Sequence, residues 1–148
     1  LDQSFNDEQP CTVEVKVKAK AVTWENRVVC GTDGACSNQS YPKIARAGCG
    51  VSFGVAHPAN RSYPLKGACQ TAQRAEAHAM LTAMRTSWME TLILTDSAFV
   101  VTCIHKIRNG CDPARMEHSD IWHEVKLVMD NRPWDWFMIR KVKAHRKI

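Results

Sequence analysis

The chain has 148 residues, of which 45% are hydrophobic and 24% are charged, a composition typical of an ordinary globular domain. No apolar run reaches the roughly 20 residues that a membrane-spanning helix needs, and no signal-peptide pattern opens the sequence. The net charge of +5 and the pI near 8.9 are compatible with a polyanionic partner, although many basic proteins bind none.

Seven cysteines are scattered through the sequence without a CxxC pair. This pattern argues against a complete disulfide framework and favours a reducing compartment, so we expect an intracellular protein of the nucleus or cytoplasm that is not secreted. Cys103, His105, Cys111 and His118 have spacings that match no standard zinc site. Most of the cysteines are expected to be small buried hydrophobes.

Residues 1–25 are interpreted as a linker or flanking strand of a longer polypeptide, and residues 26–148 as the domain that follows. The first ten residues are mostly polar and acidic, and the chain begins with Leu rather than Met. Between Val13 and Ala21 apolar side chains alternate with charged ones, which predicts a strand with one wet face.

Three strands are predicted in the next part of the chain. Residues 27–34 form an apolar run that ends in Asp-Gly, which predicts a strand whose tip carries Asp33. Residues 37–48 are rich in loop formers. Residues 48–56 and 61–68 predict two further strands joined by a hairpin-like turn.

A helix and a buried strand follow. Residues 71–88 are rich in Ala and Met and contain no Gly or Pro, which predicts a helix. Residues 91–96 are a short apolar run that ends in an aspartate. Continuous apolarity of this kind is typical of a parallel strand that is covered on both faces.

Two helices and a last strand complete the pattern. Residues 97–107 predict a helix capped by Ser97, and residues 118–131 predict another with Ser119 or Asp120 at its N-cap. The segment DWFMIRKVKAH predicts the final strand. The order of elements indicates an α/β layout whose first three strands form an antiparallel meander.

Two aspartates, Asp33 and Asp96, end the first and fourth predicted strands. Sites in open α/β sheets form beyond the carboxyl ends of neighbouring parallel strands, so these carboxylates meet if the two strands are adjacent. Glu76 shares a helical face with the apolar Met80 and Met84, where an unpaired carboxylate is costly. Turn formation at the aspartates and a helix N-terminal dipole at Glu76 are the ordinary alternatives.

Three carboxylates that converge without Cys or His suit Mg²⁺ or Mn²⁺ rather than zinc. In phosphodiester hydrolysis, two such ions roughly 3.5–4 Å apart activate the attacking water and stabilise the leaving oxygen. On a basic protein this pattern favours a nuclease, with ordinary caps and turns as the alternative.

Six segments, in chain order, resemble the type 1 ribonuclease H domain: TDGAC, RAGCGVSFG, QTAQRAEAHAM, LTDSAFV, SDIWHEV and WFMIRKVKAH. The match runs from about Arg27 to His145, and the RAG and QRAE motifs are closer to the eukaryotic-type or retroelement-associated domains than to the bacterial enzyme. The resemblance implies a ribonuclease H-like α/β fold. Its mixed five-stranded sheet would combine an antiparallel meander of three strands with parallel strands, and helices would cover both faces.

The resemblance also implies site residues. Asp33, Glu76 and Asp96 fall on three of the family's four metal-binding carboxylates, which hold two Mg²⁺ ions, or Mn²⁺. His145 falls on a mobile histidine that is thought to assist product release or proton transfer. Asn38 or Gln39 would lie near the 2′-hydroxyls that distinguish RNA from DNA. The full set of implied contacts to the RNA–DNA hybrid is Asn38, Gln39, Thr71, Gln73, Arg74 and Ser97.

Three features depart from the family pattern. Ala72 stands where the eukaryotic-type enzyme usually has Asn, and residues 105–119 are too short for its Trp- and Lys-rich basic protrusion. No acid follows His145, although the family places a fourth aspartate beyond that histidine, at the start of a final helix. The domain is therefore expected to be C-terminally truncated, without its last helix, and to under-ligate the second ion.

Taken together, the sequence predicts a metal-dependent endonuclease that cuts the RNA strand of RNA–DNA hybrids and leaves 3′-hydroxyl and 5′-phosphate ends. It would be a module of a larger, retroelement-like protein with covalently linked neighbouring domains and no contact with membranes. The alternative is a catalytically impaired remnant of the same fold that binds nucleic acid. Another nuclease or integrase of the superfamily is a third interpretation, which the QRAE motif disfavours.

Overall fold

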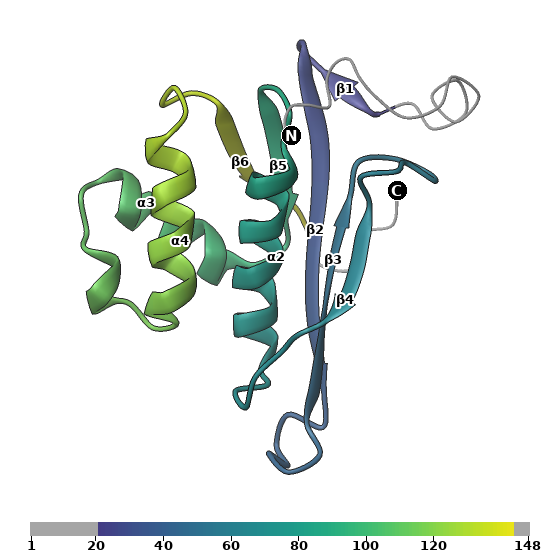
Figure 1. Ribbon diagram of the computed structural model, residues 1–148, viewed down its shortest axis with the longest axis vertical. Helices are drawn as coiled ribbons and strands as arrows, with labels where there is room; N and C mark the ends of the chain where they lie inside the picture. Colours follow the sequence, from purple (N-terminus) through teal and green to yellow (C-terminus); the bar gives the residue numbers. More distant parts are fainter. Residues whose placement is uncertain (1–20, 144–148) are drawn as a thin grey trace.

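A computed structural model describes residues 21–143, which form a mixed β-sheet with three α-helices packed against it (Figure 1). The strand expected between Val13 and Ala21 falls almost wholly outside the described residues, and so does His145. None of the helices in residues 21–143 has both the length and the apolar character that crossing a bilayer requires.

The sheet has the strand order β4-β3-β2-β5-β6, and the two-residue strand β1 pairs with the start of β2 beside this path. β4, β3 and β2 form the predicted antiparallel meander, while β2, β5 and β6 run parallel. The predicted mixed five-stranded sheet is therefore confirmed. The strands are β1 (Thr23–Trp24), β2 (Arg27–Ser37), β3 (Arg46–Ser52), β4 (Arg61–Pro64), β5 (Thr91–Thr95) and β6 (Phe137–Lys141).

The described helices lie together on one side of the sheet (Figure 1). They are α2 (Ala72–Thr86), α3 (Ala98–Arg108) and α4 (Ser119–Asp130), with a short 3₁₀ turn, η1 (Pro113–Arg115), before α4. Two crossover connections, β4 to β5 and β5 to β6, move in the same direction along the strand order. Right-handed crossovers that move in the same direction place their helices on the same face of the sheet. We expected helices on both faces of the sheet. Within residues 21–143 the helices lie on one face only.

α2 packs its small side chains directly onto β2 and β3. Thr71 begins the helix, because its hydroxyl accepts a hydrogen bond from the Arg74 amide at 3.1 Å. Ala75, Ala79 and Met80 are fully buried, so the helix backbone lies close to the strands. This close packing positions the N-terminal turns of α2 against the middle of β2.

β2 is longer than predicted. The strand does not end at Gly34 but continues to Ser37, and the pairing with β3 extends from Gly31 to Ser37. Asp-Gly tolerates a turn but does not require one, and the long ladder with β3 keeps the backbone extended here. Asp33 therefore lies within a strand, at the level where the neighbouring strand β5 ends.

Candidate active site

Asp33 and Asp96 stand at the same level on adjacent strands. The last residue pair between β2 and β5 is Gly31 with Leu94, and each aspartate follows its member of that pair by two residues. The Thr32 hydroxyl donates to the Leu94 carbonyl at 3.3 Å, which ties the two chains together just before the acids. β2 and β5 are adjacent and parallel, as the predicted site requires, and this register puts both aspartates at the carboxyl ends of neighbouring strands.

Gly34 brings Glu76 next to these aspartates. A Cβ atom at Gly34 would lie 2.4 Å from the Glu76 amide nitrogen and 2.6 Å from the Ala75 carbonyl carbon. The α2 backbone thus rests on β2 at a point where only glycine fits. The backbone of Glu76 is therefore held beside the residue that follows Asp33.

Burial and the charges of both aspartates act on Glu76. Glu76 is half-buried, and loss of hydration raises the pKa of its carboxyl group. The Ser97 hydroxyl lowers that pKa, while the negative charges of Asp96 and Asp33 raise it further. A partly buried carboxylate that lies near two others is stabilised when a cation binds, because the cation offsets their negative charges. The acids therefore suit Mg²⁺ in their charge, and their oxygen atoms suit it as donors. Within residues 21–143, however, no three His, Cys, Asp or Glu side chains converge closely enough to hold one ion jointly.

Several of the predicted hybrid-contacting residues hold the backbone of the site. Thr71 caps α2, and the Gln39 side-chain oxygen accepts from the Ala72 amide at 3.0 Å. Ser97 is only 5% exposed and caps α3, where it accepts from the Val100 amide at 3.1 Å. These side chains fix the start of each helix next to the acids.

Asn38 and Gln73 lie exposed near the N-terminus of α2. Asn38 adopts a left-handed backbone conformation, with φ of 58°, where the chain turns after β2. The carbonyl of Asn38 accepts from the Tyr41 amide at 2.9 Å and closes that turn. These two side chains are therefore accessible to a ligand from solvent.

Arg74 braces α2 against α4. Its guanidinium donates to both carboxylate oxygens of Asp120, at 3.1 and 2.6 Å, and lies 3.4 Å from the His118 ring nitrogen Nδ1. The predicted N-cap of α4 at Ser119 or Asp120 is wrong. His118 occupies that position with φ of 62° and makes no side-chain cap, since Asp120 is engaged by Arg74.

Replacing Asp120 with Asn is expected to reduce stability slightly and only above acid pH. Arg74 lowers the pKa of Asp120 to about 2. Because the pKa is lower in the folded state, the ion pair stabilises the protein fully above the unfolded-state pKa, near 3.9. This stabilisation disappears as the pH falls toward 2. Asp120 is largely exposed, so we expect a loss of about 0.5–1 kcal/mol at pH 7. Urea unfolding at pH 7 and pH 3 measures this, and an equal loss at both would contradict the ion-pair explanation.

Two contacts that shape the site could not be predicted from sequence patterns. The Asp120 partner of Arg74 lies 46 positions away in the chain, and the Gln39 contact to α2 spans 33 positions. No periodicity or spacing signals such contacts. The role of Gly34 did have a signal, because a glycine directly after a candidate site aspartate marks a close backbone approach.

Comparison with known proteins identifies the family of this chain. The model of the RNase H family matches residues 25–148. Ribonuclease H1 of Rattus norvegicus is 44% identical over 81 residues, which make up 52% of this chain and 28% of that protein. Ribonuclease H of Schizosaccharomyces pombe is 38% identical over 82 residues, covering 55% of this chain and 31% of that protein. The match thus spans less than a third of either relative.

Solved structures share the fold. The PFV RNase H domain superposes with a TM-score of 0.58 at 24% identity and covers 79% of each chain. The foamy viral protease-reverse transcriptase in complex with dsDNA gives a TM-score of 0.61 at 22% identity, over 82% of this chain and 84% of that one. Because the family model matches most of the sequence and the fold agrees, the chain belongs to the RNase H family.

Proposed function

We propose that this chain is a metal-dependent endonuclease that hydrolyses the RNA strand of RNA–DNA hybrids, as a module of a larger, retroelement-like protein. Membership of the RNase H family supports the reaction class. The observation that carries the proposal is that Asp33 and Asp96 stand at the same level of β2 and β5 and that the charges of both raise the pKa of Glu76.

Asp33, Glu76 and Asp96 would hold the divalent ions. Ions bound there supply activation of a water nucleophile and stabilisation of the leaving oxygen. Asp33 is held by its strand and Glu76 by the helix that rests on Gly34, so both carboxylates are supported by rigid elements. His145 would assist proton transfer or product release.

The surroundings of the acids suit a nucleic-acid duplex. From Gly34 to Arg74 the sequence contains no Asp or Glu but five Lys or Arg residues. Positive charges without neighbouring acids in the sequence attract phosphates without regard to base sequence. Asn38, Gln39 and Gln73 would lie along the minor groove, where 2′-hydroxyls identify the RNA strand.

The test is cleavage of a labelled RNA–DNA hybrid by the 148-residue chain with Mg²⁺, beside single-stranded RNA and double-stranded RNA. We expect cutting of the hybrid alone, and a loss of roughly 100-fold or more in Asp96→Asn, because charge stabilisation by a bound ion is worth several kcal/mol. Glu90→Gln is the matched control, since Glu90 is exposed and lies just before the opposite end of β5. It should cut at the wild-type rate.

Two other outcomes would change the proposal. Hybrid binding without cleavage by the wild-type chain would favour the catalytically impaired, nucleic-acid-binding alternative. Equal cutting of all substrates, or an Asp96→Asn variant as active as wild type, would exclude the proposed site.

A further inference from the structure

A threonine stands directly before each of the two site aspartates, as Thr32-Asp33 and Thr95-Asp96. The aspartates follow neighbouring strands, but the pairing of β2 with β5 ends at Gly31 and Leu94, before either acid. Beyond that level β2 continues alongside β3 (Figure 1). The two aspartates therefore lie where the backbones of β2 and β5 are no longer paired with each other.

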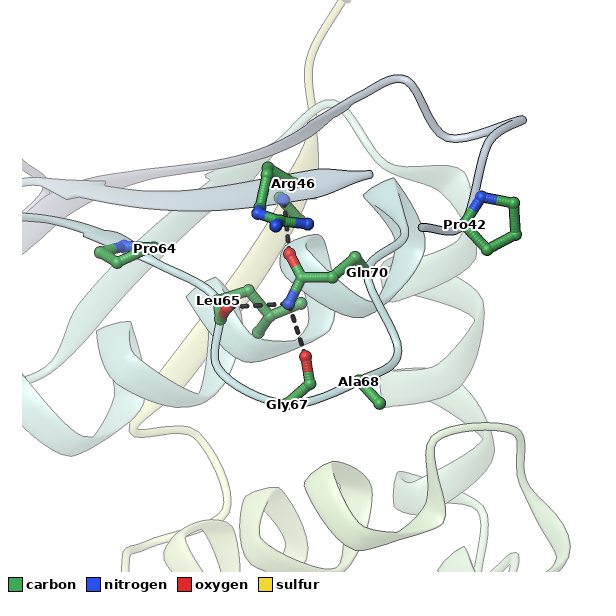
Figure 2. A pocket seen from close by; sticks show the side chains of 8 residues that line it. Pro42, Arg46, Pro64, Leu65, Gly67, Ala68 and Gln70 are labelled. Carbon is green, nitrogen blue, oxygen red and sulfur yellow. Dashed lines mark hydrogen bonds between the residues drawn. The ribbon is translucent and has the colours of Figure 1, made fainter. Parts of the chain in front are cut away.

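Asp33 and Glu76 belong to one connected block, made of β2, β3 and α2. Asp33 lies in the ladder between β2 and β3, and the α2 backbone rests on Gly34. The loop before α2 is tied to β3 as well, because the Gln70 side-chain oxygen accepts from the Ala47 amide at 2.6 Å (Figure 2). These contacts fix Asp33 and the backbone of Glu76 relative to each other.

Asp96 belongs to a second block, made of β5, β6 and α3. The Thr95 hydroxyl accepts from the Ser97 amide at 3.1 Å, and this bond holds the turn that contains Asp96. The Thr95 carbonyl accepts from the Val142 amide at 2.8 Å, which fixes the end of β5 to the chain that follows β6. Asp96 is thus positioned by contacts that involve neither β2 nor β3.

The Thr32 hydroxyl joins the two blocks just before the acids. It donates to the Leu94 carbonyl at 3.3 Å, and within residues 21–143 no other side-chain hydrogen bond links β2 to β5. Thr32 is half-buried, so water does not fully replace this bond when it is lost. Because the backbone ladder ends one residue earlier on β2, this bond limits how far the strands separate where Asp33 and Asp96 follow.

We propose that Thr32 is a positioning residue that sets the separation of Asp33 and Asp96 and thereby favours Mg²⁺ over the larger Ca²⁺. The inference rests on the part of the proposed function that assigns divalent ions to these acids. Mg²⁺ demands near-ideal octahedral coordination at about 2.0–2.1 Å, whereas Ca²⁺ accepts irregular coordination at about 2.3–2.6 Å. When the two blocks can move relative to each other, their carboxylates lose affinity for Mg²⁺ more than for Ca²⁺.

The test is calorimetric titration of the 148-residue chain with Mg²⁺ and with Ca²⁺, as wild type and as Thr32→Val. Valine has nearly the shape of threonine but no hydroxyl, so the substitution removes the hydrogen bond without opening a cavity. We expect Mg²⁺ to bind about 10-fold more weakly and Ca²⁺ to change by less than about 3-fold, since contacts that support metal ligands typically affect affinity to this extent. Thr32→Ser keeps the hydroxyl and should keep the wild-type ratio of the two affinities.

Thr91→Val is the matched control. Thr91 lies at the opposite end of β5, is fully buried, and donates its hydroxyl hydrogen to the Met89 carbonyl at 2.6 Å. This variant also loses a threonine hydrogen bond, so it should unfold at a lower temperature but keep the wild-type ratio of Mg²⁺ to Ca²⁺ affinity. Thermal unfolding without added metal measures the fold of each variant. If Thr91→Val changed the ratio as much as Thr32→Val, general loss of stability would explain both, and the positioning role would be excluded.

The results separate the two proposals. If the wild type binds Mg²⁺ and cuts hybrid but Thr32→Val keeps the wild-type ratio of affinities, the positioning role is excluded and the nuclease stands. If the wild type binds Mg²⁺ without cutting hybrid, the nuclease proposal fails, and the affinity ratio of Thr32→Val alone decides the role of Thr32. If the wild type binds neither ion, both proposals fail.

Discussion

Gly34→Ala is expected to destabilise the protein by about 3 kcal/mol and to reduce hybrid cleavage about 100-fold. The new methyl group would lie 2.4 Å from the Glu76 amide nitrogen and 2.8 Å from its Cα, whereas ordinary contacts begin near 3.4 Å. Both sides of the clash are backbone, so α2 or β2 must move by about 1 Å. Overpacking of this kind typically costs 1–3 kcal/mol, and a 1 Å misplacement of a site can cost 100-fold in rate.

Gly31→Ala is the matched control for this variant. Gly31 lies on the same strand, three residues earlier, and a Cβ atom there would meet nothing within 4 Å. Alanine at that position reduces the freedom of the unfolded chain, so we expect stability to stay the same or to rise by about 0.5 kcal/mol. Urea unfolding and single-turnover cleavage of both variants measure the difference. Equal effects of the two substitutions would contradict the close approach of α2 to β2.

The elements of the fold were predictable because each has a local periodic signal. The helix at α2 follows from an Ala- and Met-rich run without Gly or Pro, and the strand at β5 from continuous apolarity. The position of Asp33 and Asp96 at the same level of the sheet was also predictable, since both follow apolar runs and such ends lie side by side in parallel neighbours. Ser97 as the cap of α3 follows from its place directly before the helix.

The remaining features depend on contacts between distant parts of the chain. β2 continues past Asp33 because β3 pairs with it, and Asp-Gly by itself is compatible with either a turn or a strand. Ser119 and Asp120 both have side chains that can cap a helix, but the Asp120 carboxylate instead accepts a hydrogen bond from Arg74. The Gln70 side chain joins the loop before α2 to β3 through the Ala47 amide, while the local sequence around Gln70 indicates only a loop.

The location of the described helices depends on the connections between strands, which no local pattern reveals. The expectation of helices on both faces came from the resemblance rather than from the connections between strands. In residues 21–143 the two crossovers step in the same direction, which places α2, α3 and α4 on one face. The strand order would have been enough to predict this, but strand order itself is set by long-range pairing.

Glu76→Gln is expected to abolish cleavage and at the same time to stabilise the fold. Burial and the charges of Asp96 and Asp33 raise the pKa of Glu76 above its ordinary value near 4.5. A raised folded-state pKa means that the folded protein retains a proton which the unfolded chain releases. The contribution of Glu76 to wild-type stability is therefore largest below pH 4.5, and it is lost as the pH rises through the folded-state pKa of that group. Glutamine carries no charge at any pH and avoids this loss.

Thermal unfolding of wild type and Glu76→Gln between pH 4 and pH 8 tests the prediction. The variant should match the wild type near pH 4 and exceed it increasingly at higher pH, while its cleavage rate falls roughly 100-fold or more. Added Mg²⁺ should raise the wild-type melting temperature more than that of the variant, because an ion bound only by the folded state stabilises it. Glu90→Gln measures the general effect of losing one negative charge. A variant that is less stable than wild type across the whole range would show that Glu76 is held by favourable contacts, and that repulsion among the three acids does not dominate this site.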